Sequence, residues 1–207
     1  MPLEIETKLT IPDIAMLESI ATDPRVLPLL EDEFGQIQLS AVYYDTSAGL
    51  LSSRRWALRM RREDGCCVTA FKMPGDSRYT RREWQCQTSD LHKAVQFFVA
   101  EGAPPELAGE WSWQVRCTAE ITRRRGIVKT ADGLRAELAL DMGTLSADDR
   151  IEPVCELELE LLEGSEAQLE ALTNCFQHWF GLIPQPLSKI ARAMALRSEE
   201  DDNCRKT

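Results

Sequence analysis

Several features that define common protein classes are scarce in this sequence. Only two of its 207 residues are histidine, and no apolar run approaches the roughly 18 residues that a membrane-spanning helix needs. The first residues, Met-Pro-Leu-Glu-Ile-Glu, contain neither the basic nor the apolar segment of a secretory signal. We therefore expect a cytoplasmic protein without a membrane partner, and neither a histidine-based zinc site nor a Ser/His/Asp nucleophile.

Disulfide bonds are also not expected. The chain has seven cysteines, an odd number, and the neighbouring Cys66 and Cys67 have poor geometry for a disulfide within one strand. No pair of cysteines has the spacing of a zinc site. Reduced thiols, most of them buried, fit a cytoplasmic chain.

The composition is that of a globular protein with segregated charge. Hydrophobic residues make up 43% of the chain and charged residues 28%, and the net charge is −10. Residues 51–130 hold 15 Lys/Arg against 9 Asp/Glu, whereas the remaining residues hold 9 against 25. Global acidity disfavours binding of nucleic acid, although a run of three arginines at 123–125 leaves a nucleic-acid patch as a minor alternative. With no internal repeat to divide the chain, we expect one domain over residues 1–197 and a charged tail over 198–207.

Periodicity predicts about eight strands and four helices. Alternating apolar and polar residues place strands at 3–11, 36–44, 55–62, 66–72, 78–87, 115–129 (one strand or two), 134–144 and 151–162. Helices are expected at 13–21, 90–100, 166–180 and 187–197. Ser165 and Gln168 form a capping box before the third helix, and Gly181 ends it.

Six of these strands carry charge on one face. The charged positions, spaced by two along each strand, are Glu4, Glu6, Lys8, Arg59, Arg61, Lys72, Arg81, Glu83, Arg123, Arg125, Glu156, Glu158 and Glu160. In a half-exposed sheet such charges only aid solubility. The last three, however, place carboxylates about 7 Å apart on one face, where they repel one another unless cations lie among them.

Eight antiparallel strands are enough to close a barrel, and its interior can be polar if it holds a ligand. We therefore predict an α+β fold, a closed eight-stranded antiparallel β-barrel with flanking helices. Turned inward, the charged faces would line a tunnel with arginine and lysine on one side and glutamate on another. Carboxylates are ligands for Mg²⁺ or Mn²⁺, and guanidinium groups bind phosphate oxygens in pairs.

The motifs then resemble a known family, the CYTH superfamily, also called triphosphate tunnel metalloenzymes. The resemblance begins with Glu4-Ile5-Glu6-Thr7-Lys8, which matches the ExExK motif of that family, and it extends over residues 3–195. The further matching pieces, in order, are Tyr43-Tyr44-Asp45-Thr46, Leu58-Arg59-Met60-Arg61, Phe71-Lys72, Arg81-Arg82-Glu83, Leu138-Ala139-Leu140-Asp141, Cys155-Glu156-Leu157-Glu158 and Leu187-Ser188-Lys189-Ile190-Ala191-Arg192.

The resemblance implies a tunnel that binds a small-molecule triphosphate together with Mg²⁺ or Mn²⁺. The residues that match metal positions of the family are Glu4, Glu6, Glu156 and Glu158, with Glu160 and Asp141 as further acidic positions. The residues that match phosphate-binding positions are Lys8, Arg59, Arg61, Lys72, Arg81, Arg123, Arg125, Lys189 and Arg192. Arg81 is taken as inward, rather than Arg82, because it shares a strand face with Glu83. The residues expected to take part in catalysis are Lys8, Glu6, Arg59 and Lys72.

The chain is most similar to the bacterial inorganic triphosphatases of this family. The resemblance therefore implies hydrolysis of tripolyphosphate to pyrophosphate and phosphate. A class IV-type adenylate cyclase, a thiamine triphosphatase and a non-catalytic binding module are the alternatives. Ala57 stands where thiamine triphosphatases carry a tryptophan, and strand parity predicts that the adjacent Trp56 packs outside the tunnel. The family contains monomers and dimers, so either state is open.

Overall fold

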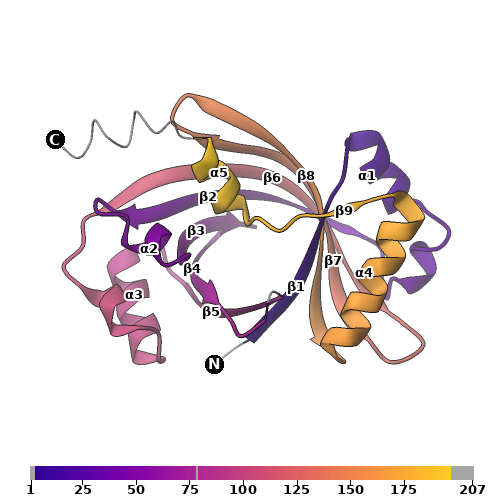
Figure 1. The fold of residues 1–207 in the computed structure, drawn as a ribbon, viewed down its shortest axis with the longest axis horizontal. Coiled ribbons are helices and arrows are strands. Elements are labelled where there is room, and N and C mark those ends of the chain that lie inside the picture. Colours follow the sequence, from indigo (N-terminus) through magenta and orange to yellow (C-terminus); the bar gives the residue numbers. More distant parts are fainter. Residues whose placement is uncertain (1–2, 78, 197–207) are drawn as a thin grey trace.

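The centre of the protein is one antiparallel sheet that closes on itself (Figure 1). The computed structural model describes residues 3–77 and 79–196. The predictions that concern Arg78, Cys204 and residues 197–207, including the charged tail, lie outside these residues. The strand order is β5-β4-β3-β2-β6-β7-β8-β1, and pairing of β5 with β1 completes the barrel. The predicted closed eight-stranded barrel is confirmed.

The strands of the sheet are β1 (Leu3–Thr10), β2 (Gly35–Thr46), β3 (Ala57–Glu63), β4 (Cys66–Pro74), β5 (Thr80–Gln87), β6 (Trp113–Lys129), β7 (Arg135–Ala147), β8 (Arg150–Glu163) and the short β9 (Ile183–Pro184). The helices are α1 (Ile14–Ala21), α2 (Leu50–Ser53), α3 (Leu91–Ala100), α4 (Glu166–Phe180) and α5 (Lys189–Ala195), with 3-10 turns η1 (Leu27–Leu29) and η2 (Pro105–Ala108).

The elements follow the sequence signals closely. The segment 115–129, predicted as one strand or two, is the single long strand β6. The Ser165–Gln168 capping box before α4 is present, and Gly181 ends that helix with a left-handed φ of 67°. Four short elements were not predicted, α2, β9 and the 3-10 turns η1 and η2, because each is too short to show a periodicity.

Register shows which face of each strand points inward. Residues directly opposite in an antiparallel pair share a face, and the pairs include Ala41 with Arg61 and Lys72 with Glu83. The charged faces of neighbouring strands therefore align around one interior. This alignment gives the predicted tunnel its charged lining.

Most of the apolar core lies outside the barrel, beneath the helices. On one side α1 and α4 cover β1, β7 and β8, with Leu9, Leu157 and Phe176 at 0–1% exposure. On the other side α3 covers β4 and β5, with Phe71 and Phe98 fully buried. Helices on both outer faces hold the barrel from two sides, as Figure 1 shows.

A third apolar cluster lies inside the barrel. It joins inward residues of β2 and β6, among them Leu39, Ala41 and Ile121, to Ile190 and Ala193 of α5. The helix α5 therefore packs against the inner wall of the barrel at one end, next to β2 and β6 in Figure 1. The barrel interior is divided into an apolar zone covered by α5 and a charged zone beside it.

In the described part of the chain, no helix has the length and apolarity to cross a membrane. The six cysteines within that part are free thiols. Only Cys117 is buried, so the prediction of mostly buried thiols is wrong for these six.

Candidate active site

The barrel interior holds a cavity of about 880 Å³. Side chains from all eight barrel strands line it, together with residues 186–191 and 194 in and before α5. The sequence-predicted site residues that line the cavity are Glu4, Glu6, Lys8, Arg59, Arg61, Lys72, Arg81, Arg123, Arg125, Asp141, Glu158, Glu160 and Lys189. Glu156 and Arg192 lie behind this lining. Thirteen of the fifteen predicted residues thus line one space; strand parity predicted eleven of them, and the family resemblance added Asp141 and Lys189.

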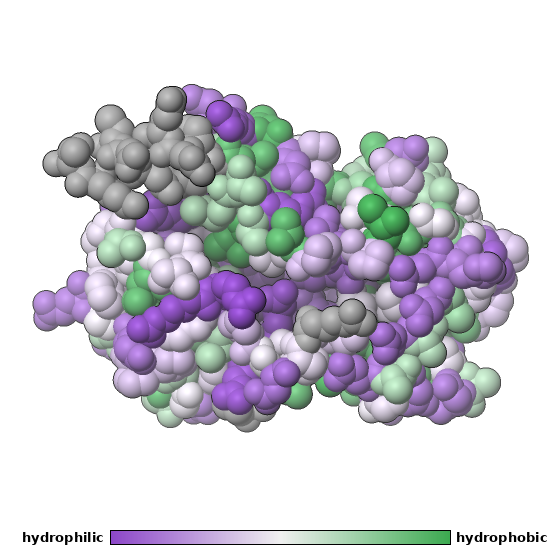
Figure 2. All heavy atoms as spheres, viewed as in Figure 1, coloured by the Kyte–Doolittle hydropathy of each residue, from purple (hydrophilic) through white to green (hydrophobic). Residues whose placement is uncertain are grey.

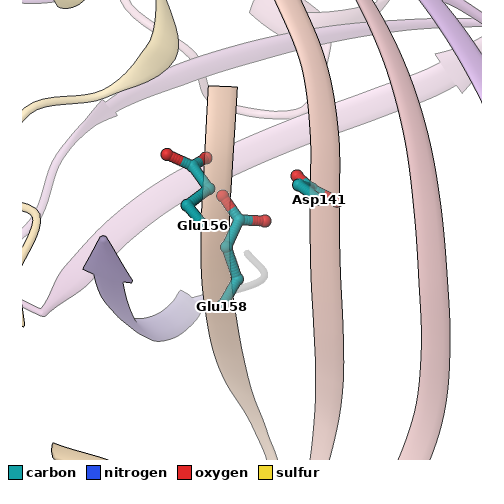
Figure 3. A group of neighbouring side chains, drawn as sticks. All are labelled: Asp141, Glu156 and Glu158. Carbon is teal, nitrogen blue, oxygen red and sulfur yellow. The ribbon is translucent and has the colours of Figure 1, made fainter. Parts of the chain in front are cut away.

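Three carboxylates form the tightest acidic group in the cavity wall. Asp141 on β7 and Glu156 and Glu158 on β8 offer oxygens within 4.8 Å of one another, and Figure 3 shows the three side chains converging. Lys189, at the start of α5, already contacts all three: its Nζ lies 2.8 Å from Asp141 Oδ2 and 2.9 Å from Glu158 Oε1, and it also pairs with Glu156. An ammonium group has three N–H donors, so Lys189 is fully used here.

Glu156 forms an ion pair with a second cation, Arg192. Arg192 Nη1 lies 3.1 Å from Glu156 Oε2, and the side chain of Glu156 is only 1% exposed. Arg192 also pairs with Glu152 of β8 and donates to the Pro153 carbonyl oxygen. In this arrangement the N–H donors of Lys189 and Arg192 bind carboxylates and a carbonyl oxygen of β7 and β8. These contacts hold α5 against the barrel wall.

Arg123 completes the ion-pair network around this group. Its guanidinium donates to both oxygens of Asp141 at 2.7 Å and also pairs with Glu158. Burial alone would raise the pKa of Glu158, but the ion pairs with Lys189 and Arg123 hold that pKa well below its ordinary value. The group is thus neutralised from within the protein.

A second acidic group lies beside it, and one of its members, Glu160, has no ion pair within the described residues. Register sets Glu160 of β8 directly opposite Glu6 of β1 and Glu137 of β7. Glu4 accepts from Lys72 Nζ at 2.6 Å, whereas within residues 3–77 and 79–196 no cation forms an ion pair with Glu160. Burial and then the carboxylate of Glu4, with smaller effects of Glu137 and Glu6, raise the pKa of Glu160 to about 7. The uncompensated negative charge of the cavity therefore lies here.

The neighbouring Glu6 is held by two cations. Lys8 Nζ and Arg81 Nε lie 2.9 Å and 3.2 Å from Glu6 Oε1. The pairing with Lys8 lowers the pKa of Glu6 despite its burial. Oxygen-only donor sets of this kind fit a hard divalent cation such as Mg²⁺ or Mn²⁺. Glu4, Glu6 and Glu160 line the cavity outside the group that Lys189 and Arg123 neutralise, so they are the carboxylates with room for such a cation.

Positive charge in excess of acidic partners lies on β3. Arg59 and Arg61 both line the cavity, and among residues 3–77 and 79–196 the buried Nε donor of each has no hydrogen-bond acceptor. Burial lowers the pKa of Arg61, and the neighbouring guanidinium groups of Arg59 and Arg123 lower it further. Buried donors without acceptors are costly unless a ligand meets them. This face of the cavity is therefore built for an anion.

The motif Tyr43-Tyr44-Asp45-Thr46 stabilises the backbone at one edge of the cavity. The Asp45 side chain accepts backbone N–H bonds from Thr46, Leu51 and Ser52 at 2.7–2.9 Å. These bonds tie α2 and the segment that enters β3 to the end of β2. Trp56, just beyond α2, packs in the outer core 5.4 Å from the Phe71 ring, as parity predicts, although part of it also lines the cavity.

Sequence reasoning missed several lining residues. Glu63 pairs with Arg61 and Arg125 at 2.6 Å and 3.1 Å, and Glu137 lies on the inward face. Continuing the parity of Arg61 by two residues and that of Asp141 by four would have found both. The lining residues outside the strands, Arg55 among them, could not be found in this way, because strand alternation does not extend to them.

The arginine run 123–125 is split by the pleat of β6. Arg123 and Arg125 face the cavity, whereas Arg124 points outward and pairs with Glu18 of α1 at 2.6 Å. The three arginines therefore form no continuous patch.

Solved structures of the same architecture come from distant organisms. HpAC1 from Hippeastrum, a proposed adenylyl cyclase described as having a dominant triphosphatase activity, is 19% identical with a TM-score of 0.61, over 94% of this chain and 97% of that one. A proposed adenylate cyclase from Bacillus halodurans is 17% identical (TM-score 0.58; 91% and 96% covered). The PH1819 protein of Pyrococcus horikoshii is 16% identical (TM-score 0.57; 94% and 99% covered). At these identities the likeness establishes the fold.

A closed β-tunnel lined by opposed cations and carboxylates defines the class of protein: a triphosphate tunnel enzyme. The sequence matches the CYTH domain over residues 2–194, and the chain belongs to the CYTH family. It is accordingly a triphosphate hydrolase or an adenylyl cyclase of that family.

Proposed function

We propose that this protein hydrolyses inorganic tripolyphosphate to pyrophosphate and phosphate, with Mg²⁺ or Mn²⁺. The observation that carries the proposal is the pair Arg59 and Arg61 in the cavity wall, whose buried Nε donors have no acceptor within the part of the chain that the structure describes. A phosphate oxygen is the acceptor that such guanidinium groups bind best. Carboxylates with room for a divalent cation lie across the same cavity, as phosphoryl transfer requires.

The proposal assigns a role to each of the basic residues that line the cavity. Arg59, Arg61 and Lys72 spread the charge of the terminal phosphoryl group, and Lys8 and Arg81 bind the remaining phosphates. A water oxygen attacks the terminal phosphorus, the bridging P–O bond breaks, pyrophosphate leaves, and the proton of the water passes to solvent. Fixed cations in an enclosed site stabilise the charge that shifts to the leaving oxygen.

The acidic residues would hold the metal. A bound divalent cation supplies neutralisation of phosphate charge and a more acidic water. Glu4, Glu6 and Glu160 are open to this role, and of these Glu160 has the least compensation by protein cations. Asp141, Glu156 and Glu158 can join them only where Lys189 moves away, because its Nζ contacts all three.

One observation favours a second candidate function. The cavity volume of about 880 Å³ is larger than an inorganic triphosphate would fill. Its wall also has an apolar part, formed by Leu39, Ala41, Ile121 and Met194. An organic triphosphate could place its base or ring there. In a cyclase reaction the ribose 3′-oxygen of ATP attacks the α-phosphorus and pyrophosphate leaves.

Product analysis separates the candidates. Purified protein is incubated with tripolyphosphate, thiamine triphosphate or ATP, each with Mg²⁺, with Mn²⁺ and with chelator, and phosphate and cyclic AMP are measured. We expect metal-dependent phosphate release, fastest from tripolyphosphate. Cyclic AMP from ATP would show the cyclase instead, and tight binding without turnover would show a binding module.

A pair of matched variants tests the site itself. Glu6→Gln removes a carboxylate of the cavity, whereas Glu120→Gln removes one from the exposed face of β6, where Glu120 accepts a hydrogen bond from Ser40 Oγ. We expect Glu6→Gln to lower turnover by about two orders of magnitude or more and Glu120→Gln to leave it unchanged. Activity of Glu6→Gln near that of the wild type would contradict the metal role.

A further inference from the structure

One arginine at the edge of the cavity has a conformation and surroundings unlike the others. Arg55 lies between α2 and β3 with a φ of 57°, a left-handed value that residues other than glycine rarely adopt. It is exposed and lines the cavity. Within residues 3–77 and 79–196, no carboxylate forms an ion pair with it.

The neighbouring arginine, by contrast, is directed away from the cavity. Arg54 lies over the Trp56 ring at 4.8 Å and pairs with Glu106 at 3.2 Å. The left-handed turn at Arg55 thus separates two consecutive arginines, one engaged with the outer surface and one at the opening. Strongly hydrophilic residues gather in the region of α2 and β3 in Figure 2.

The segment that carries Arg55 is fixed by buried polar contacts. Asp45 accepts from Leu51 and Ser52, and Arg116 donates to the carbonyl oxygen of Thr46. The position of the Arg55 backbone is therefore determined by the barrel itself. A flexible surface loop would not hold a strained residue at one place.

The far end of β3 carries a carboxylate. Glu63 lines the cavity there and pairs with Arg61 and Arg125 at 2.6 Å and 3.1 Å. A polyanion approaching a chain of net charge −10 is repelled on average. The end that carries Arg55 is the favourable entrance.

We propose that Arg55 makes the first contact with the incoming triphosphate at this entrance. It holds the outer phosphate group while the other phosphate groups of the triphosphate reach Arg59 and Arg61. The inference rests on the proposed function. It assigns Arg55 to affinity, with the chemical step left to the residues deeper in the cavity. A contact at a solvent-exposed rim acts through charge, so its effect declines as salt rises.

Three variants test the assignment. Arg55→Gly removes the cation at a position whose φ suits glycine, so the fold is preserved. Arg62→Gln removes the same charge from the exposed outer face of β3 and serves as the control. Arg55→Lys keeps the charge.

The affinity for tripolyphosphate is measured by calorimetry at low and high salt, and turnover is measured in parallel. We expect Arg55→Gly to weaken binding about fivefold at roughly 20 mM salt, with a smaller effect at roughly 500 mM. Arg62→Gln should stay within about twofold of the wild type, Arg55→Lys should recover most of the loss, and kcat should change little.

Equal affinities of Arg55→Gly and Arg62→Gln at low salt would overturn the inference, as would a loss that salt does not reduce. Binding by the wild type without turnover would overturn the proposed hydrolysis while the affinities still decide the role of Arg55. A wild type that does not bind tripolyphosphate would overturn both.

Discussion

Glu160 gives the sharpest quantitative test of the electrostatics of the tunnel. Burial and the carboxylates of Glu4, Glu137 and Glu6 raise its pKa in the folded protein to about 7, from an ordinary value of 4.5. A folded-state pKa above the unfolded one means that ionisation opposes folding. The penalty is absent below pH 4.5, grows between pH 4.5 and 7, and is complete above pH 7. The Glu160→Gln variant cannot ionise at this position, so its folded state should not carry this free-energy penalty.

The size of the effect follows from that pKa difference. A tenfold change in proton affinity is worth about 1.4 kcal/mol, so the full difference corresponds to roughly 3 kcal/mol. Because the side chain is only partly buried, solvent screening reduces the penalty to about 1–2 kcal/mol. We expect Glu160→Gln to be more stable than the wild type by that amount at pH 8 and nearly equal to it at pH 4.5.

Urea unfolding followed by circular dichroism at both pH values measures the difference. Glu120→Gln on the outer face is the control and should change little at either pH. Excess Mg²⁺ should stabilise the wild type at pH 8 and narrow its gap to Glu160→Gln, because a bound cation replaces the missing compensation. A stability gain that is the same at pH 4.5 and pH 8 would refute the reasoning, since it would not come from ionisation.

Three further predictions concern other parts of the barrel. Lys189→Met should lower the free energy of unfolding by about 3–5 kcal/mol, because it leaves three buried carboxylates without their shared cation; a loss under 1 kcal/mol in urea unfolding would contradict this. Gly143→Ala should destabilise by about 1–3 kcal/mol, since its Cβ would lie 1.9 Å from the Glu120 carbonyl oxygen where β6 and β7 meet; thermal melting checks it. Arg59→Met should fold normally yet reduce kcat/KM for tripolyphosphate by about 100-fold or more, and an unchanged kcat/KM would exclude its phosphate contact.

Local sequence signals carried most of the fold. The alternation in Glu4-Ile5-Glu6-Thr7-Lys8 and in Glu156-Leu157-Glu158-Leu159-Glu160 predicts both the strand and the inward face, because side chains of a strand point to opposite sides in turn. The same parity brought Arg59, Arg61 and Arg81 to the cavity. The short helix α2 was not predicted, since hydrogen bonds to Asp45 rather than an apolar periodicity hold it in place.

Which cation meets which carboxylate was decided by the tertiary structure alone. Nothing in the sequence pairs Lys189 with Asp141, Glu156 and Glu158, because their meeting depends on α5 packing inside the barrel. The sequence thus determined the charged lining through a local rule of strand geometry. The division of that lining into a compensated group and an uncompensated one at Glu160 depends on strand register and barrel closure, which join residues from distant parts of the chain.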